Sequence, residues 1–301
     1  MAQFTILNDK GLIEEKEWLN KISILENRYE EKNFITDIDH AKTLVQESLF
    51  NAIYLRAQNN FGILFSGGLD SSLIALICKK HLNKEFNCYA IGLEDSSDIE
   101  YAKEVASSLK LNLKTKILSL NDVESYLKKC IDLLNTKDVI RLEIAIVIYA
   151  GLEFAIQDNC LNIFTGAGSE EIFAGYDRHI EFYKQGLEKL HTESWNGLKS
   201  CYSRDLTRDY LLAKKFNVGL LLPFLDETLI KNVMNIHPKL KTDGKEKKII
   251  LRELAIDLGL PKDIAYRKRT AAQYGSRISN AILKLTKQNG FKLKQDYINS
   301  L

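Results

Sequence analysis

The sequence lacks the residue clusters that mark a metal centre or a redox site. Its five cysteines and five histidines are scattered, with no C-x-x-C pair and no regular spacing. A structural zinc site and a histidine-based catalytic triad are therefore not indicated. Dispersed thiols in apolar surroundings are typical of proteins in a reducing compartment, and we expect a cytoplasmic protein.

Further absences narrow the class of protein. No run of 18 apolar residues crosses the chain and no signal peptide opens it, so we expect no membrane association. The formal net charge of +2 argues neither for nor against nucleic acid, but no strongly basic face is visible. The G-x-x-x-x-G-K-S/T pattern is also missing, so the γ-phosphate chemistry of Walker-type NTPases is not indicated.

What the sequence does contain is a strand, a glycine turn and a helix in direct succession. Ile63 to Phe65 form a short apolar run typical of a buried parallel strand, and Leu69 to Leu82 show helical spacing. Ser66-Gly67-Gly68 separates them. Such a turn exposes backbone N–H groups beside the positive end of a helix, which is an anion site suited to pyrophosphate.

The remaining apolar patterns predict an α/β protein. Strands and helices alternate from the loop to about residue 165, and no convincing strand follows Tyr176. We expect a doubly wound parallel sheet, with ligands at the carboxyl ends of the strands and a mostly helical C-terminal part. Beyond the loop, the expected strands are 86–93, 113–118 and 161–165, and the expected helices are 99–109, 121–134 and 141–157.

Several motifs together resemble a known family. In chain order they are Ser66-Gly-Gly-Leu-Asp-Ser-Ser72, Thr165-Gly-Ala-Gly-Ser-Glu-Glu-Ile-Phe-Ala-Gly-Tyr176, Leu222-Pro-Phe-Leu-Asp226 and Lys247-Lys-Ile-Ile-Leu-Arg-Glu253. The first resembles the PP-loop of the N-type ATP pyrophosphatases. The whole set resembles the synthetase domain of the glutamine-dependent asparagine synthetases and of the related β-lactam synthetases, over roughly residues 40 to 280.

The resemblance implies an AMP-forming ligase. In this family ATP and Mg²⁺ convert a carboxylate into an acyl-adenylate, pyrophosphate leaves, and ammonia or an amine displaces AMP. We therefore expect residues 37–301 to form an ATP pyrophosphatase domain, preceded by a helical extension over residues 1–36. A separate glutaminase subunit and a homodimer are further partners that the resemblance allows.

The resemblance also implies the site residues. Lys248, Asp70 and Arg252 would be catalytic, with Lys248 stabilising the charge on the departing pyrophosphate. Asp70 and Glu170 would hold Mg²⁺, although relatives usually have Asp where Glu170 stands. ATP would meet Leu64, Ser66, Gly67, Gly68, Asp70, Ser71, Ser72, Ile91, Thr165 and Gly166. A substrate pocket would include Glu143, Ala167 and Glu171.

Without the resemblance, Glu170 and Glu171 are explained as favourable charges in the first turn of a helix, and Lys248 as part of a solvated basic run.

The sequence departs from the family at the positions that deliver nitrogen. Full-length relatives expose a cysteine after removal of Met1, whereas Ala2 stands here, and the segment before the loop is short. We therefore expect no release of ammonia from glutamine by this chain. Ala167 stands where asparagine synthetases have Glu and β-lactam synthetases have Tyr, and a methyl group neither accepts a proton nor donates a hydrogen bond.

Charge reversal at the substrate side argues against aspartate as the substrate. Glu143 aligns where synthetases present an arginine, and Leu221 replaces another. A carboxylate on so apolar a helix needs a partner. Either an internal cation, such as Arg141 or an arginine elsewhere, pairs with Glu143, or Glu143 faces the acceptor pocket and receives a cationic group.

Two alternatives to the ligase remain at this point. A PP-loop enzyme that modifies tRNA would need a basic face or a sulfur-carrying cysteine pair. A degenerate nucleotide-binding subunit supporting a glutaminase is favoured by Ala167, whereas the intact Asp70 and Lys248 count against it.

Overall fold

The computed structural model describes residues 7–8, 11–27, 34–57, 60–268 and 270–301. The chain forms two compact units, each built from three stretches. Unit 1 consists of Met1–Gln58, Gly166–Thr207 and Leu222–Tyr266, and unit 2 of Asn59–Thr165, Arg208–Leu221 and Arg267–Leu301. The expected extension over residues 1–36 and domain over residues 37–301 stay a prediction.

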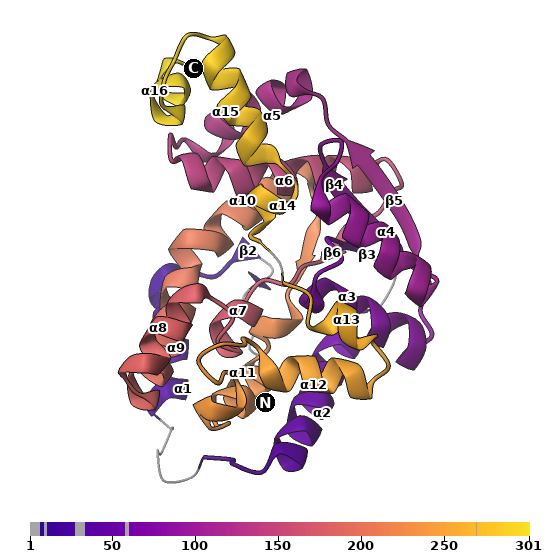
Figure 1. Ribbon diagram of the computed structural model, residues 1–301, viewed down its shortest axis with the longest axis vertical. Helices are drawn as coiled ribbons and strands as arrows, with labels where there is room; N and C mark the ends of the chain where they lie inside the picture. Colours follow the sequence, from indigo (N-terminus) through magenta and orange to yellow (C-terminus); the bar gives the residue numbers. More distant parts are fainter. Residues whose placement is uncertain (1–6, 9–10, 28–33, 58–59, 269) are drawn as a thin grey trace. The chain divides into compact units, whose positions relative to one another are not determined.

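Unit 2 contains a parallel sheet with helices on both sides, as expected from the sequence (Figure 1). Its strand order is β5-β4-β3-β6-β7, and every neighbouring pair is parallel. The strands are β3 (Gly62–Leu64), β4 (Asn87–Gly92), β5 (Asn112–Ile117), β6 (Asn162–Phe164) and β7 (Gly219–Leu221). The helices are α3 (Leu69–Leu76), α4 (Ser97–Leu109), α5 (Leu120–Leu134), α6 (Val139–Ile156), α10 (Thr207–Phe216), α14 (Ala272–Gly275), α15 (Ile278–Gln288) and α16 (Lys294–Ser300), with a π-helical turn, η2, at Ile77–His81.

The strand order creates a switch point between β3 and β6. From β3 the chain adds β4 and β5 on one side of the sheet, and it then returns to add β6 and β7 on the other side. In open α/β sheets the ligand binds at such a point, outside the carboxyl ends of the strands. Ser66-Gly67-Gly68 follows β3 and Thr165 follows β6, so both predicted glycine motifs begin here.

The prediction that no strand follows Tyr176 was wrong. β7 pairs in parallel with β6 through Leu220 and Leu221, and the Thr165 N–H extends the ladder by donating to the Leu221 carbonyl at 3.2 Å. An edge strand this short has too few residues for a period-two pattern. The helix predicted over Leu69 to Leu82 is regular only to Leu76 and continues as η2.

Unit 1 is mainly helical. Its helices are α1 (Glu15–Asn27), α2 (Ile38–Arg56), α7 (Ser169–Ile172), α8 (Asp177–Gln185), α9 (Leu187–Cys201), α11 (Glu227–Met234), α12 (Ile249–Asp257) and α13 (Lys262–Ala265). Shorter elements are the strands β1 (Leu7–Asn8) and β2 (Gly11–Leu12), a π turn η3 (Tyr202–Leu206), and the 3-10 turns η4 (Pro223–Leu225) and η5 (Pro238–Leu240). Trp18, Phe173 and Phe224 are buried in its core, with the two phenylalanine rings edge to face at 6.3 Å. No helix among the described residues is long and apolar enough to span a membrane.

Candidate functional site

The predicted site residues fall into two groups, one in each unit. The nucleotide loop, Leu64, Ile91, Thr165 and Glu143 belong to unit 2. Unit 1 carries Gly166, Ala167, Glu170, Glu171, Lys248 and Arg252.

The loop in unit 2 is shaped by Gly67. Its φ is +66°, and a Cβ atom there would lie 2.5 Å from the carbonyl carbon of Tyr101 in α4. Only glycine satisfies both the left-handed backbone and this close approach. The loop is therefore packed directly on α4, and the chain turns at Gly68 into α3.

Two serines, Ser71 and Ser72, lie in the first turn of α3. Gly68 caps the helix, and its carbonyl accepts from the Ser72 N–H at 2.9 Å and from Ser71 Oγ at 3.3 Å. Ser72 is fully buried, and its Oγ has no hydrogen-bond partner among the described residues. A buried hydroxyl without a partner is costly, so this atom is suited to a ligand that supplies an acceptor.

Leu64 and Ile91 lie on β3 and β4 and turn their side chains toward α6. A Cβ atom at Gly151 of that helix would lie 2.6 Å from Leu64 Cδ2 and 3.5 Å from Ile91 Cγ1. Their side chains are thus used for packing, and the predicted contact of both residues with adenine through backbone atoms stays a prediction.

Glu143 has an internal partner. Its carboxylate is 2% exposed and lies 2.6 Å from the ammonium of Lys294 in α16, which also donates to Ser279 Oγ at 2.6 Å. The cation is a lysine and not the arginine considered from the sequence. This contact favours the internal ion pair over the pocket role, and the assignment of Glu143 to a substrate pocket stays a prediction.

In unit 1, Lys248 and Glu170 form an ion pair. Lys248 Nζ lies 2.7 Å from Glu170 Oε1 and 3.2 Å from Ser169 Oγ. Lys248 is 5% exposed, so it is not part of a solvated basic run. It precedes α12 with φ of +56°, a conformation that costs energy for any residue with a Cβ atom. Strain of this kind concentrates at functional sites.

Gly175 provides the space for this ion pair. A Cβ atom there would lie 1.9 Å from Glu170 Oε2 and 2.4 Å from Lys248 Cε. Neither Gly175 nor Ser169 was among the predicted site residues, although both lie within the second motif. Their small side chains are the sequence feature that could have identified these two residues.

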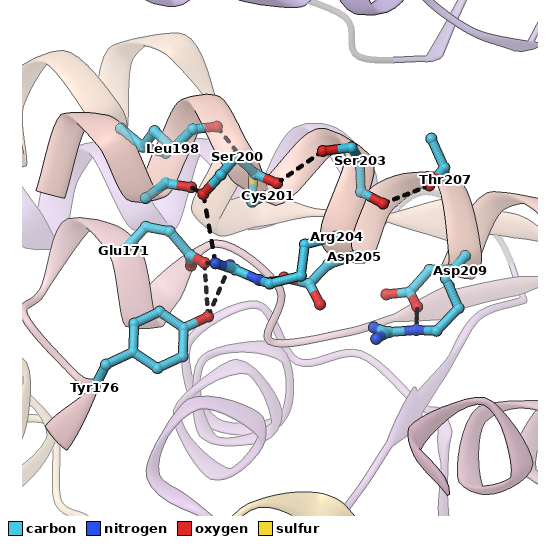
Figure 2. A network of polar contacts seen from close by, with 12 residues as sticks. Glu171, Tyr176, Leu198, Ser200, Cys201, Ser203, Arg204, Asp205, Thr207 and Asp209 are labelled. Carbon is cyan, nitrogen blue, oxygen red and sulfur yellow. Dashed lines mark hydrogen bonds and ion pairs between the residues drawn. The ribbon is translucent and has the colours of Figure 1, made fainter. Parts of the chain in front are cut away.

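Glu171 lies in a separate network (Figure 2). Its carboxylate, 2% exposed, accepts from the Tyr176 hydroxyl at 2.7 Å and from Arg204 at 2.5 Å. Burial raises the pKa of Glu171, and it also raises the pKa of Tyr176. The Tyr176 ring lies against the guanidinium of Arg178 at 4.0 Å. Arg204 stands far from the motif in sequence, and no pattern indicated it.

The Arg252 side chain binds backbone carbonyls rather than the Lys248 side chain. Its Nε donates to the Lys247 carbonyl at 2.6 Å, a second nitrogen donates to the Ala265 carbonyl, and its guanidinium lies over the Tyr266 ring. These contacts tie α12 to α13. The predicted catalytic role of Arg252 stays a prediction, and the structure adds a positioning role for the segment that carries Lys248.

The carboxylates suit Mg²⁺ bound together with phosphate. Mg²⁺ uses one or two protein carboxylates and completes its shell with water and phosphate oxygens. Asp70, in the first turn of α3 in unit 2, and Glu170, beside Lys248 in unit 1, are each a carboxylate of this kind, and their assignment to Mg²⁺ stays a prediction. The described residues contain no group of three or more His, Cys, Asp or Glu side chains that would form a cage without phosphate.

The fold and the loop define an α/β protein of the PP-loop class. The particular family is given by sequence comparison, in which the Asparagine synthase family model matches residues 44–185 and 183–292. The chain belongs to the asparagine synthase family.

Individual relatives agree with this family. The chain is 31% identical to a glutamine-hydrolyzing asparagine synthetase 1, described as putative, from Methanocaldococcus jannaschii, over 92% of this chain and 58% of the relative. It is 30% identical to the glutamine-hydrolyzing asparagine synthetase of Rattus norvegicus, over 87% of this chain and 47% of the relative. The chain thus spans about half the length of these relatives. Among solved structures, NMN synthetase from Francisella tularensis covers 88% of this chain and 94% of its own, at 12% identity and a TM-score of 0.44, which is too low to add support.

Proposed function

We propose that this chain activates a carboxylate with ATP and transfers the acyl group to ammonia or an amine. In the first step a carboxylate oxygen attacks the α-phosphorus, the bond between the α- and β-phosphates breaks, and pyrophosphate leaves. In the second step the nitrogen lone pair attacks the acyl carbon, the bond to AMP breaks, and the nitrogen loses a proton. Family membership and the PP-loop fold support an ATP-dependent ligase in general.

The observation that carries the proposal is the buried, unpartnered hydroxyl of Ser72 at the start of α3. Together with the Gly67-Gly68 turn it provides donors without acceptors, which is the complement of a pyrophosphate group. No internal hydrogen bond among the described residues satisfies this hydroxyl. Ser66, Asp70 and Ser71 belong to the same loop and helix start.

Lys248 and Glu170 supply the charges for departure of pyrophosphate. Lys248 would stabilise the negative charge that builds up on the leaving group, where a preorganised cation acts most strongly. Glu170 and Asp70 would each be a carboxylate for Mg²⁺, whose chemistry is to neutralise the phosphate oxygens. The ion pair keeps Lys248 extended toward Glu170 before ligand binds.

Nitrogen transfer would not use a base at position 167. Ala167 has no titratable atom, and Glu171 is already bonded to Tyr176 and Arg204. An amine that arrives neutral, such as ammonia, needs no base to become nucleophilic. The acyl substrate would differ from aspartate, because the arginines expected for the family are replaced by the apolar Leu221 and by Glu143, which is paired with Lys294 and offers no cation.

The test combines isotope exchange with a serine variant. The protein is incubated with ATP, Mg²⁺ and a panel of carboxylic acids, and exchange of labelled pyrophosphate into ATP is measured. We expect exchange with one acid class and AMP plus pyrophosphate as products, with ammonium serving as nitrogen source. Stoichiometric ADP and phosphate would exclude the mechanism.

The Ser72→Ala variant tests whether the loop hydroxyl takes part in ATP binding. Removing an unpartnered buried hydroxyl should leave the unliganded protein as stable as the parent, or more so, while ATP binding weakens about tenfold. Thr228→Ala in α11 is a control, because this position belongs to neither group of predicted site residues. Equal ATP affinity in the parent and Ser72→Ala would contradict the assignment.

A further inference from the structure

The α7 turn, residues 171–176, is closed by three side chains of unit 1 (Figure 2). The Tyr176 hydroxyl donates to Glu171 Oε1 at 2.7 Å. A single nitrogen of Arg204, Nη2, lies 2.5 Å from the same oxygen and donates to the Tyr176 hydroxyl at 3.0 Å. One guanidinium therefore holds the side chains at both ends of the turn.

The α7 turn is directly connected to the ion pair of Glu170 and Lys248. Glu170 precedes Glu171 in the chain, and Gly175 precedes Tyr176. The Gly175 N–H donates to the Glu170 carbonyl at 2.8 Å. A Cβ atom at Gly175 would lie 1.9 Å from Glu170 Oε2 and 2.4 Å from Lys248 Cε. A shift at either end of the turn would therefore move the Glu170 carboxylate or close the space that the ion pair occupies.

The backbone of the α7 turn is strained at Ala174. This residue is fully buried and has φ of +54°, a left-handed conformation that residues with a Cβ atom rarely adopt. Such a conformation persists only where the surrounding structure enforces it. The hydrogen bonds of the Tyr176 side chain, two residues further along, are contacts of this kind.

Arg204 reaches the α7 turn from the segment that follows α9. It lies on the π turn η3, and its Nε donates to Asp205 Oδ2 at 2.7 Å, which orients the guanidinium. π-helical turns are rare, and many occur at functional sites. Burial raises the pKa of Glu171, whereas the Tyr176 hydrogen bond and the Arg204 charge oppose this rise. The cation thus favours the ionised form of a buried carboxylate.

We propose that Arg204 is a positioning residue that holds both ends of the α7 turn and thereby fixes the Glu170–Lys248 ion pair. Its importance for catalysis rests on the proposed function, in which Lys248 stabilises the departing pyrophosphate. A misplacement of about 1 Å at such a group can lower turnover by about 10²-fold. Arg204 acts on the reaction through the turn that carries the ion pair.

Chemical labelling tests the positioning role without using activity. The native whole chain is treated with a trace of acetic anhydride at constant pH, and acetylation of each lysine is measured by mass spectrometry. Lys248 is 5% exposed and Lys241 is 1% exposed, and both belong to unit 1, so Lys241 reports general loosening of the unit. In Arg204→Met we expect labelling of Lys248 to rise about tenfold while labelling of Lys241 stays within about twofold, because only the turn opens.

Two further variants separate positioning from lost packing. Arg178→Met is the matched control, because this arginine also lies against the Tyr176 ring, at 4.0 Å, but pairs with Glu193 at 2.7 Å. It should leave the labelling of Lys248 unchanged. Arg204→Lys keeps the cation and should return the labelling toward that of the parent, although a lysine lacks the planar fork of an arginine.

A double variant covers the case in which Arg204→Met does not fold. Removal of the cation leaves the Glu171 carboxylate buried without its charge partner, which destabilises the folded state. Glu171→Gln combined with Arg204→Met removes this unpaired charge. It should show the same rise in labelling at Lys248, with a melting temperature closer to that of the parent.

Pyrophosphate exchange measures the effect on catalysis. Arg204→Met should lower turnover by about 10²-fold with the KM for ATP within about threefold, and Arg204→Lys should recover most of the loss. Unchanged labelling of Lys248, an equal rise at Lys241, or unchanged turnover in Arg204→Met would overturn the proposal. If the labelling responds as expected but the parent shows no exchange with any acid, the proposed function fails and the positioning of the ion pair by Arg204 stands.

Discussion

Lys248 Nζ lies 2.7 Å from Glu170 Oε1, although the two residues stand on different segments of unit 1, and the Lys248 backbone has φ of +56°. The strained backbone and the ion pair are two separate properties of this buried lysine. Neither is needed for a helix to begin at Ile249. Together they indicate that the position of this ammonium matters more than local stability.

Lys248 can be tested with two substitutions that differ only in backbone freedom. Lys248→Ala and Lys248→Gly both remove the ammonium, and each should lower turnover by on the order of 10²-fold while ATP affinity stays within several-fold. Glycine tolerates a positive φ, so Lys248→Gly should be more stable than Lys248→Ala by about 1 kcal/mol. Pyrophosphate exchange, calorimetric binding and denaturant unfolding measure these effects, and unchanged turnover would return Lys248 to a structural role.

Gly175→Ala should disturb the ion pair without unfolding the protein. The new methyl group would collide with the flexible ends of Glu170 and Lys248, which can move aside. We expect turnover to fall at least tenfold with a change in melting temperature of a few degrees. Gly197→Ala is the matched control, because a Cβ atom there meets Glu171 Cγ at an ordinary 3.4 Å. Equal turnover in both variants would show that the space at Gly175 is not required.

The Glu143–Lys294 pair makes a prediction about stability. Glu143→Gln removes one charge of a buried pair and should cost about 3 kcal/mol of unfolding free energy, as should Lys294→Met. The double variant Glu143→Leu with Lys294→Met should recover much of the loss, because apolar replacement of both partners removes the unpaired charge. Denaturant unfolding measures the cycle. A raised KM for the acyl substrate with unchanged stability in Glu143→Gln would restore the pocket role.

Acid should destabilise the protein through His179 and His191. Burial lowers the pKa of each from the ordinary 6.5 to about 3. Between these values the unfolded chain binds more protons than the folded chain, so stability falls as the pH falls from about 6.5 toward 3. Each histidine contributes a slope of about 1.4 kcal/mol per pH unit. His179→Phe should remove one such slope in urea unfolding between pH 6.5 and 4.5, and an unchanged slope would contradict the prediction.

Sequence alone predicted the features that depend on local pattern. The strands β3 to β6 and the glycine turn after β3 follow from apolar runs and from residues that permit a tight turn, and the structure contains them. β7 was not predicted, because its three residues, Gly219 to Leu221, show no periodicity. Their strand conformation comes from pairing with β6.

The partners of buried charges could not be predicted from the sequence. Glu143 was expected to need a cation, but Lys294 lies 151 positions away along the chain, and nothing in its local pattern marks it. Arg204 beside Glu171 is a similar case. Which distant side chains meet is decided by tertiary packing, and a single sequence contains no record of those contacts.

The interleaving of the two units has a consequence for biosynthesis. The last stretch of unit 1 ends at Tyr266, whereas unit 2 still requires residues 267–301 to complete it. As the polypeptide leaves the ribosome, every residue of unit 1 is therefore translated before the sheet-containing unit has all of its parts. Helices α5 and α6, made much earlier, must await α15 and α16, which pack on them, and a ribosome stalled after residue 266 would leave their apolar surfaces exposed to chaperones.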